Sequence, residues 1–168
     1  MKNTNLAVVW DLDGTLADNS QRRHLAPGDP QWTAGDAPWD EWALACGDDM
    51  PIMGSVVRMR MDYAYYQVHI CSSRGAIAYE QTRDWLGRTA GKCYDYLTLR
   101  TRGDCRPGKV LKAEYILGLQ ADGLTVMLAY EDIKEDADYI TEMTGVQVML
   151  VNPAYEWIEV LRDSSGTG

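Results

Sequence analysis

Short apolar runs alternate with longer segments of helical spacing along most of the chain, and this alternation constrains the fold more than any other feature. Each run has six or seven residues, mostly Val, Ile, Leu, Met and Tyr, which is the composition of strands buried on both faces. Strands that alternate with helices predict a parallel, doubly wound α/β sheet of the Rossmann-like kind. We expect strands at 6–12, 67–72, 94–99, 125–130 and 146–151, and helices at 52–66, 76–90, 107–119 and 133–144.

The segment 19–50 interrupts this alternation. It holds three of the six prolines and three of the six tryptophans, and a connection of this length inside a compact domain is usually a functional lid or an insertion. The stretch PWDEWALACGDD predicts one short helix within it. The 168 residues suffice for one domain, which we place at 1–162 with a flexible tail at 163–168.

The chain carries no signal for a membrane. No apolar run approaches the roughly 18 to 20 residues that a spanning helix needs. The N-terminal residues MKNTNLAVVWDLDG contain one Lys and lead directly into acids, which predicts a first strand and not a signal peptide. Four well-separated cysteines and two histidines give neither a zinc spacing nor a disulfide framework. We therefore expect a cytoplasmic protein with no membrane partner.

Polar side chains gather where the predicted strands end. They are Asp11 and Asp13 after the first strand, Ser72, Ser73 and Arg74 after the second, and Glu131, Asp132 and Asp136 after the fourth. In a doubly wound sheet, ligands bind outside the carboxyl ends of the strands. The sequence therefore predicts one polar site at this edge of the sheet.

The residue types in this site favour phosphoryl chemistry on a hard cation. Clustered carboxylates repel one another unless a cation keeps them ionised, and a ligand set made only of oxygen favours Mg²⁺. One carboxylate can attack phosphorus and form an aspartyl-phosphate, while a second acts as general acid and base. Gly14 allows a twist after the first strand, so that Asp11 and Asp13 both reach the site.

Four motifs, in this order along the chain, resemble those of the haloacid dehalogenase (HAD) phosphohydrolases. DLDGTLAD resembles motif I, HICSSRG resembles motif II, Lys112 resembles the lysine of motif III, and YEDIKED resembles motif IV. The resemblance implies a HAD-type Rossmann-like fold with a short cap and a bound Mg²⁺. It further implies catalytic roles for Asp11, Asp13, Ser72 and Lys112, a substrate contact at Thr15, and metal ligation by Asp11, Asp13 (through its backbone carbonyl) and Asp132.

Longer stretches are similar to the phosphatase domain of phage polynucleotide kinase-phosphatases and its stand-alone phage relatives. They are NSQRRH, WDEWALACGDDMPI, CSSRG and RTRGDCRPGKVLKAEYI, and the likeness extends over residues 6–152. It implies removal of 3′-phosphates from nucleic-acid ends or nucleotides, substrate contacts from Arg22, Arg74, Arg100 and Arg106, and a host-cytoplasmic location if the chain is phage-encoded. Because the sequence has no GxxxxGK[ST] phosphate loop, a kinase or ligase would be a separate partner.

Charge leaves the substrate open. The net charge is −9, but residues 98–112 carry five basic side chains against Asp104, a local net of +4, which predicts an anionic ligand there. The acidic remainder favours a small substrate, so a phosphatase of (deoxy)nucleoside monophosphates is the first alternative. A phosphate-end binding module without catalysis is the second, and Glu131, where relatives carry Asp, is the feature in its favour.

Two assignments stay open at this stage. Lys109 competes with Lys112 as the phosphate-site lysine, and Arg23 competes with Arg22 as the phosphate-site arginine. In both pairs the register of the resemblance favours the residue in the predicted set. The oligomeric state and the choice between DNA and RNA are not readable from these motifs.

Overall fold

The computed structural model describes residues 4–27 and 37–151, and within them it confirms the parallel α/β sheet. The sheet order is β5-β4-β1-β6-β7, and every neighbouring pair is parallel. The strands are β1 (Leu6–Trp10), β4 (Gln67–Gly75), β5 (Tyr96–Arg100), β6 (Thr125–Glu131) and β7 (Val148–Leu150). The predicted tail at 163–168 and the part of the insertion at 28–36 lie outside the described residues.

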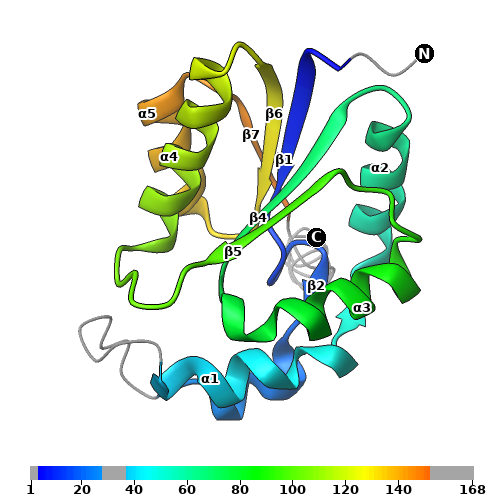
Figure 1. Ribbon diagram of the computed structural model, residues 1–168, viewed down its shortest axis with the longest axis vertical. Coiled ribbons are helices and arrows are strands. Elements are labelled where there is room, and N and C mark those ends of the chain that lie inside the picture. The colour runs from blue at the N-terminus through cyan, green and yellow to red at the C-terminus, as the bar shows by residue number, and fades with distance from the viewer. Residues whose placement is uncertain (1–3, 28–36, 152–168) are drawn as a thin grey trace, which may run out of the picture.

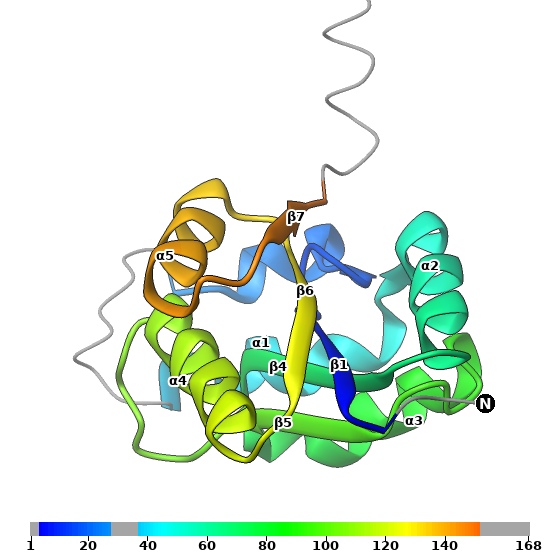
Figure 2. The ribbon, with the colours of Figure 1, turned by 90° about the horizontal axis from the view of Figure 1, so that it is seen from above.

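Helices cover both faces of the sheet (Figures 1 and 2). One face carries α2 (Met53–Tyr63) and α3 (Tyr79–Thr89), and the other carries α4 (Gly108–Ala121) and α5 (Lys134–Thr144). Because strand side chains alternate between faces, Val8 and Trp10 pack into one apolar cluster with the α2 and α3 side chains, and Ala7 and Val9 pack into a second cluster with those of α4 and α5. The central strand β1 is therefore buried on both faces, as its composition predicts.

Most element boundaries lie within a few residues of the predicted ones. The difference that matters for the site is at β4, which continues to Gly75 and so brings Ser72, Ser73 and Arg74 into the strand itself. Pro107 is the N-cap of α4, with ψ of 146°, and does not occupy the first helical turn. Gly145 ends α5 with φ of 71°, a left-handed conformation that glycine adopts without strain.

The insertion forms a small cap over the carboxyl end of the sheet. Two short strands, β2 (Ala17–Asp18) and β3 (Met50–Pro51), flank it, and between them lie η1 (Ser20–Leu25), α1 (Ala37–Leu44) and η3 (Ala45–Asp48). β2 and β3 pair antiparallel, which joins the two ends of the insertion. In Figure 1 the cap helix α1 lies below the lower ends of the strands.

Across residues 4–27 and 37–151, no helix has the length and apolar character that spanning a membrane requires.

Candidate active site

The predicted polar site exists at the carboxyl end of the sheet. Asp11 directly follows β1 and is buried, and its backbone N–H donates to the carbonyl of Tyr130 on β6 at 3.0 Å. This bond holds the end of β1 beside the end of β6, where Glu131 and Asp132 lie. A pocket of about 530 Å³ opens over these acids and over Asp13 and Lys112.

Both candidate lysines line this pocket. Lys112 is the one in contact with Asp11: its Nζ lies 2.8 Å from Asp11 Oδ1 and also donates to Glu131 Oε2, while Lys109 pairs with Glu135. Burial acts to lower the pKa of Lys112, but the charges of Asp11 and Glu131 outweigh it and raise that pKa, so the ammonium stays charged. Burial raises the pKa of Asp11 to about 7, against the opposing charge of Lys112.

Three carboxylates form a cluster suited to a hard divalent cation. One oxygen each from Asp11, Glu131 and Asp132 lies within 4.8 Å of the others. Burial raises the pKa of Asp132 to about 9, and the neighbouring charge of Asp11 adds to this effect. Acids held this close without a cation take up protons, and Mg²⁺ with its preference for carboxylate oxygens removes that cost. The donor set therefore fits the predicted metal.

Glu131 has a second task besides membership in this cluster. Its Oε1 accepts the backbone N–H groups of Asp132 and Ile133 at 3.1 and 3.4 Å, and its Oε2 accepts Lys112. The longer glutamate side chain thus fixes both the lysine and the start of the loop that carries Asp132. Both carboxylate oxygens of Glu131 are therefore engaged. The sequence predicts an altered metal contact at this position, and the structure gives Glu131 these hydrogen bonds.

Gly14 shapes the cluster by leaving room for Asp132. Its φ is +82°, and a Cβ built on it would lie 2.0 Å from Asp132 Oδ2. Any side chain at this position would collide with the carboxylate, and the backbone conformation disfavours residues other than glycine. Gly14 therefore allows both the turn after Asp13 and the close approach of Asp132.

Asp13 lies in different surroundings from Asp11. Arg74 donates to it from Nη2 at 2.6 Å and from Nε at 3.1 Å, and Arg22 donates to it as well. Burial acts to raise the pKa of Asp13, but these two guanidinium groups outweigh it and lower that pKa. Of the predicted metal set, the structure brings together the side chains of Asp11 and Asp132. The Asp13 carboxylate faces the arginines, and Glu131 is the third acid of the cluster.

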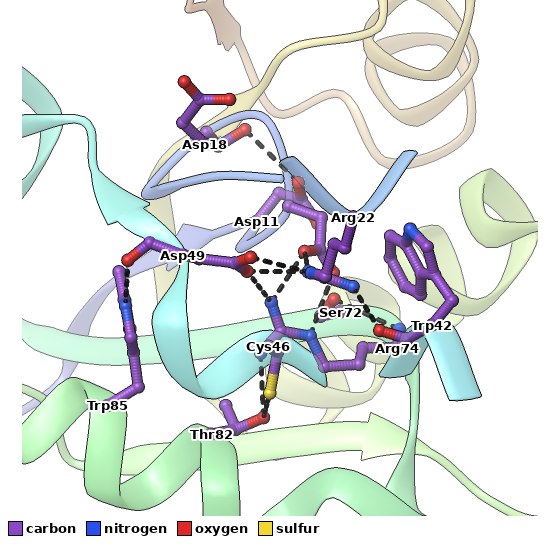
Figure 3. A network of polar contacts seen from close by, with 12 residues as sticks. Asp11, Asp18, Arg22, Trp42, Cys46, Asp49, Ser72, Arg74, Thr82 and Trp85 are labelled. Carbon is purple, nitrogen blue, oxygen red and sulfur yellow. Dashed lines mark hydrogen bonds and ion pairs between the residues drawn. The ribbon is translucent and has the colours of Figure 1, made fainter. Parts of the chain in front are cut away.

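Asp49, at the end of the cap, completes this second group and was missed by the sequence analysis. It accepts two bonds from Arg22, at 2.8 and 2.7 Å, and one from Arg74 at 3.3 Å (Figure 3). Its backbone carbonyl accepts the indole N–H of Trp85 at 2.7 Å. The only sequence signal was an acidic pair, Asp48–Asp49, just before the return to the sheet, which is indistinguishable from a solvated turn.

The two arginines are also bonded on their other sides. Arg22 donates to the carbonyl of Trp42 at 2.9 Å and stacks 3.8 Å from its ring, and Arg74 donates to Thr82 at 2.9 Å. Both side chains are buried. We refer to Asp13, Asp49, Arg22 and Arg74 as the arginine clamp.

The predicted hydroxyl residues take positions beside the acids. Thr15 is fully buried and donates to Asp11 Oδ2 at 3.2 Å, so its hydroxyl orients Asp11 and does not reach the pocket as a substrate contact would. Ser72 is buried and accepts the backbone N–H of Arg74 at 3.2 Å. Ser73, which the motif assignment did not select, lines the pocket.

Most cations of the basic segment are engaged with other groups of the protein, and two of them, Lys109 and Lys112, line the pocket over Asp11. Arg100 donates to the backbone carbonyls of Ser73, Asp104 and Arg106, so it holds the loop together and does not line the pocket over Asp11. The remaining cations of the segment are paired: Arg102 with Asp40, Arg106 with Asp104 and Glu114, Lys109 with Glu135, and Lys112 with Asp11 and Glu131. A linear charge count cannot show these pairings, because the acids come from other parts of the fold.

No family model matches the sequence, and no curated protein matches it. Solved structures do match. Two structures of a Pnkp1/Rnl/Hen1 complex, one of them described as an RNA repair complex, align with TM-scores of 0.67 and 0.70 at 23% and 21% identity and cover 88% and 90% of this chain. The chain spans less than half of those matched chains, 42% and 47% of their lengths.

Two further matches cover the whole fold. The L-2-haloacid dehalogenase of Xanthobacter autotrophicus aligns with a TM-score of 0.58 at 16% identity, over 96% of this chain and 83% of that one. A HAD family enzyme of Bacteroides thetaiotaomicron, solved as a magnesium complex, aligns with a TM-score of 0.52 at 12% identity, over 96% and 98%. The fold is therefore that of the HAD hydrolases, as the four motifs predict.

Proposed function

We propose that the protein is a Mg²⁺-dependent phosphomonoesterase that works through an aspartyl-phosphate on Asp11. One observation carries this proposal: Asp11 lies at the base of the pocket, in contact with Lys112 and within the cluster that Glu131 and Asp132 complete. A buried carboxylate that contacts a lysine and belongs to a cluster proposed to hold Mg²⁺ is placed to meet a phosphoryl group whose charge the lysine and the ion would neutralise.

The reaction has two balanced steps. In the first, an Asp11 carboxylate oxygen attacks phosphorus, the bond from phosphorus to the leaving oxygen breaks, and that oxygen takes a proton from Asp13, which takes this proton from solvent once the phosphoryl oxygens of the substrate compete with it for the arginines. In the second, water attacks phosphorus, its proton passes to Asp13, and the bond from Asp11 to phosphorus breaks, which releases phosphate. The phosphoryl oxygens are additional anions for Arg22 and Arg74, so substrate binding lessens the hold of the arginines on Asp13.

Asp11 and Asp132, with the Asp13 backbone carbonyl, are the groups we propose to hold Mg²⁺. When bound, the ion neutralises the phosphoryl oxygens and allows the clustered acids to be ionised together. Lys112 holds Asp11 and Glu131 in place, and Thr15 orients Asp11 from below.

The proposed substrate is a 3′-phosphate on a nucleic-acid end or a nucleotide. Two findings support it: the stretches similar to polynucleotide phosphatases, and the alignment with a chain of an RNA repair complex. Residues 1–162 would then form the phosphatase domain. A deoxynucleoside monophosphate phosphatase is the alternative that the net charge of −9 favours.

Phosphate release with Mg²⁺ from three substrates tests the proposal. The substrates are a 3′-phosphorylated oligonucleotide, a 5′-phosphorylated one and a deoxynucleoside 5′-monophosphate. We expect the first to react fastest. Preference for the mononucleotide would retain the Asp11 chemistry and move the protein to the first alternative. Binding of the phosphorylated ends without release from any substrate would leave the non-catalytic binding module.

A further inference from the structure

A second pocket adjoins the site, at the place where the insertion leaves and rejoins the sheet domain. It has a volume of about 410 Å³, a size typical of pockets that hold small organic ligands. Asn19 and Asp132 line both this pocket and the one over Asp11, so the two share a wall. A group that leaves the phosphorus on Asp11 can therefore lie in the second pocket. We call this second pocket the leaving-group groove.

One wall of the leaving-group groove is apolar. It consists of consecutive residues from the end of the cap into α2: Met50, Pro51, Ile52 and Met53. The two methionine side chains are 58% and 54% exposed, although they lie beside the deepest polar site of the molecule. Thioether side chains adapt their shape to a flat partner and are favoured on binding surfaces, and covering them removes apolar area from water.

A single cation with no internal partner stands in the same groove. Arg22 and Arg23 are adjacent in sequence but differ in solvent exposure: Arg22 is buried in the arginine clamp, and Arg23 is exposed. Among the described residues, the Arg23 side chain forms no hydrogen bond and no ion pair, so its guanidinium is available to a ligand. The groove also contains an acid, Asp18, whose Oδ1 already accepts the backbone N–H of Ser20 at 2.9 Å.

We propose that the leaving-group groove binds the nucleoside next to the scissile phosphate, with the base on the methionine wall and the adjoining phosphodiester on Arg23. The ligand class is a nucleotide strand end, in which a flat apolar face, a polar sugar and a second phosphate follow one another. An aryl or alkyl phosphate offers only the phosphoryl group to the first pocket. This inference rests on the proposed function for its orientation but makes a separate statement about binding.

The test measures binding and turnover on the same variants. Binding is measured with Mg²⁺ in an Asp11→Asn background, by fluorescence anisotropy of a labelled pentanucleotide without a 3′-phosphate and by its competition with a nucleoside 3′-monophosphate. Turnover compares a 3′-phosphorylated pentanucleotide with p-nitrophenyl phosphate. DNA and RNA forms of each strand are tried, which shows which sugar the groove accepts. The variants are Arg23→Ala and Met53→Ala.

The helix α2, which carries Met53, also offers matched control residues. Met61 lies two turns beyond Met53 on α2 and is 60% exposed, and Arg60 is an exposed cation near the far end of that helix. Neither lines the groove. Met61→Ala and Arg60→Ala therefore remove the same apolar group or the same charge from outside it.

We expect Arg23→Ala to weaken pentanucleotide binding about tenfold, because one charge-assisted hydrogen bond to a phosphate is lost. We expect Met53→Ala to weaken both the pentanucleotide and the mononucleotide about threefold to fivefold, because less apolar area is covered. KM for the phosphorylated strand should rise by similar factors, and by much more than KM for p-nitrophenyl phosphate.

The outcomes separate this inference from the proposed function. If no substrate releases phosphate but the binding differences appear, the phosphatase proposal fails and the groove stands. If phosphate is released but Arg23→Ala and Met53→Ala bind strands as tightly as Arg60→Ala and Met61→Ala do, the groove proposal is overturned and the phosphatase stands.

Discussion

Asp11 and Asp13 are two residues apart and chemically identical, yet the structure surrounds them with opposite environments. Asp11 is buried beside a lysine and two further acids, and its pKa is raised to about 7. Asp13 is held by two arginines, and its pKa is lowered. The difference arises from the neighbouring strands, because β6 supplies acids next to Asp11 and β4 supplies Arg74 next to Asp13.

This contrast assigns different tasks to the two acids. A carboxylate within a cluster that we propose to hold Mg²⁺ is suited to nucleophilic attack on phosphorus, because the charge of the product would be shared with the ion and Lys112. A carboxylate held by two buried arginines is kept ionised and in a fixed orientation beside the first. Two carboxylates with diverging pKa values are a recurrent sign of divided acid and base roles. The arginine clamp and the carboxylate cluster are thus two halves of one proposed site.

The largest effect is expected from removal of the nucleophile. Asp11→Asn should lower kcat for phosphate release by a factor on the order of 10³ or more, because the amide cannot form the acyl phosphate. Steady-state phosphate release from p-nitrophenyl phosphate measures it. Asp138→Asn, at an exposed acid paired with Lys134, is the control. A comparable loss of kcat in Asp138→Asn would show that Asp11 has no special role in the reaction.

The next effect concerns the arginine clamp. Asp49→Ala leaves two buried guanidinium groups with one carboxylate between them, and we expect about 3 kcal/mol of lost unfolding free energy. Denaturant unfolding measures it. Asp40→Ala, which breaks an exposed pair with Arg102, should cost less than about 1 kcal/mol. Equal losses would show that Asp49 is only another surface acid.

The sequence predicts the acids at the strand ends, because the succession of strands along the chain and the spacing of the motifs can be read locally from the sequence. Through the register of the resemblance it also favours Lys112 and Arg22 over their neighbours Lys109 and Arg23, and the structure places Lys112 beside Asp11 and Arg22 beside Asp13. It does not predict Asp49 or the pairing of Arg100 with backbone carbonyls, because both depend on how the cap and the loop after β5 fold back over the sheet.

Gly14→Ala tests whether the turn between the two acids sets their separation. A Cβ 2.0 Å from Asp132 Oδ2 and a φ of +82° should displace Asp132 and cost about 1–2 kcal/mol. We expect a smaller rise in Tm on addition of Mg²⁺. Gly118→Ala, inside α4 with open space around it, is the control and should not reduce that rise. An undiminished Mg²⁺ effect in Gly14→Ala would contradict the cluster geometry.

The smallest effect is a dependence on pH. Because the folded-state pKa values of Asp11 and Asp132 are raised to about 7 and about 9, their contribution to metal-free stability is present below their ordinary pKa and is lost as pH rises through those values. Asp13, with a lowered pKa, contributes in the opposite sense and loses its contribution as pH falls below 3.8.

Mg²⁺ binds the ionised acids and so competes with their protons. The Mg²⁺-induced rise in Tm should therefore grow between about pH 6 and about pH 9. Thermal melts at fixed Mg²⁺ concentration measure it, with Ca²⁺ as a comparison. A rise that is constant over this range would show that protons and Mg²⁺ do not share the cluster.

The most direct test of the central claim is chemical trapping of the acyl phosphate. The protein is mixed with Mg²⁺ and p-nitrophenyl phosphate, quenched in acid and reduced with borodeuteride, which converts a phosphorylated aspartate to homoserine. Peptide mass spectrometry then locates the label in residues 8–18. The account predicts homoserine at position 11 and unmodified aspartate at position 13. Homoserine at 13, or phosphate release with neither residue labelled, would contradict it.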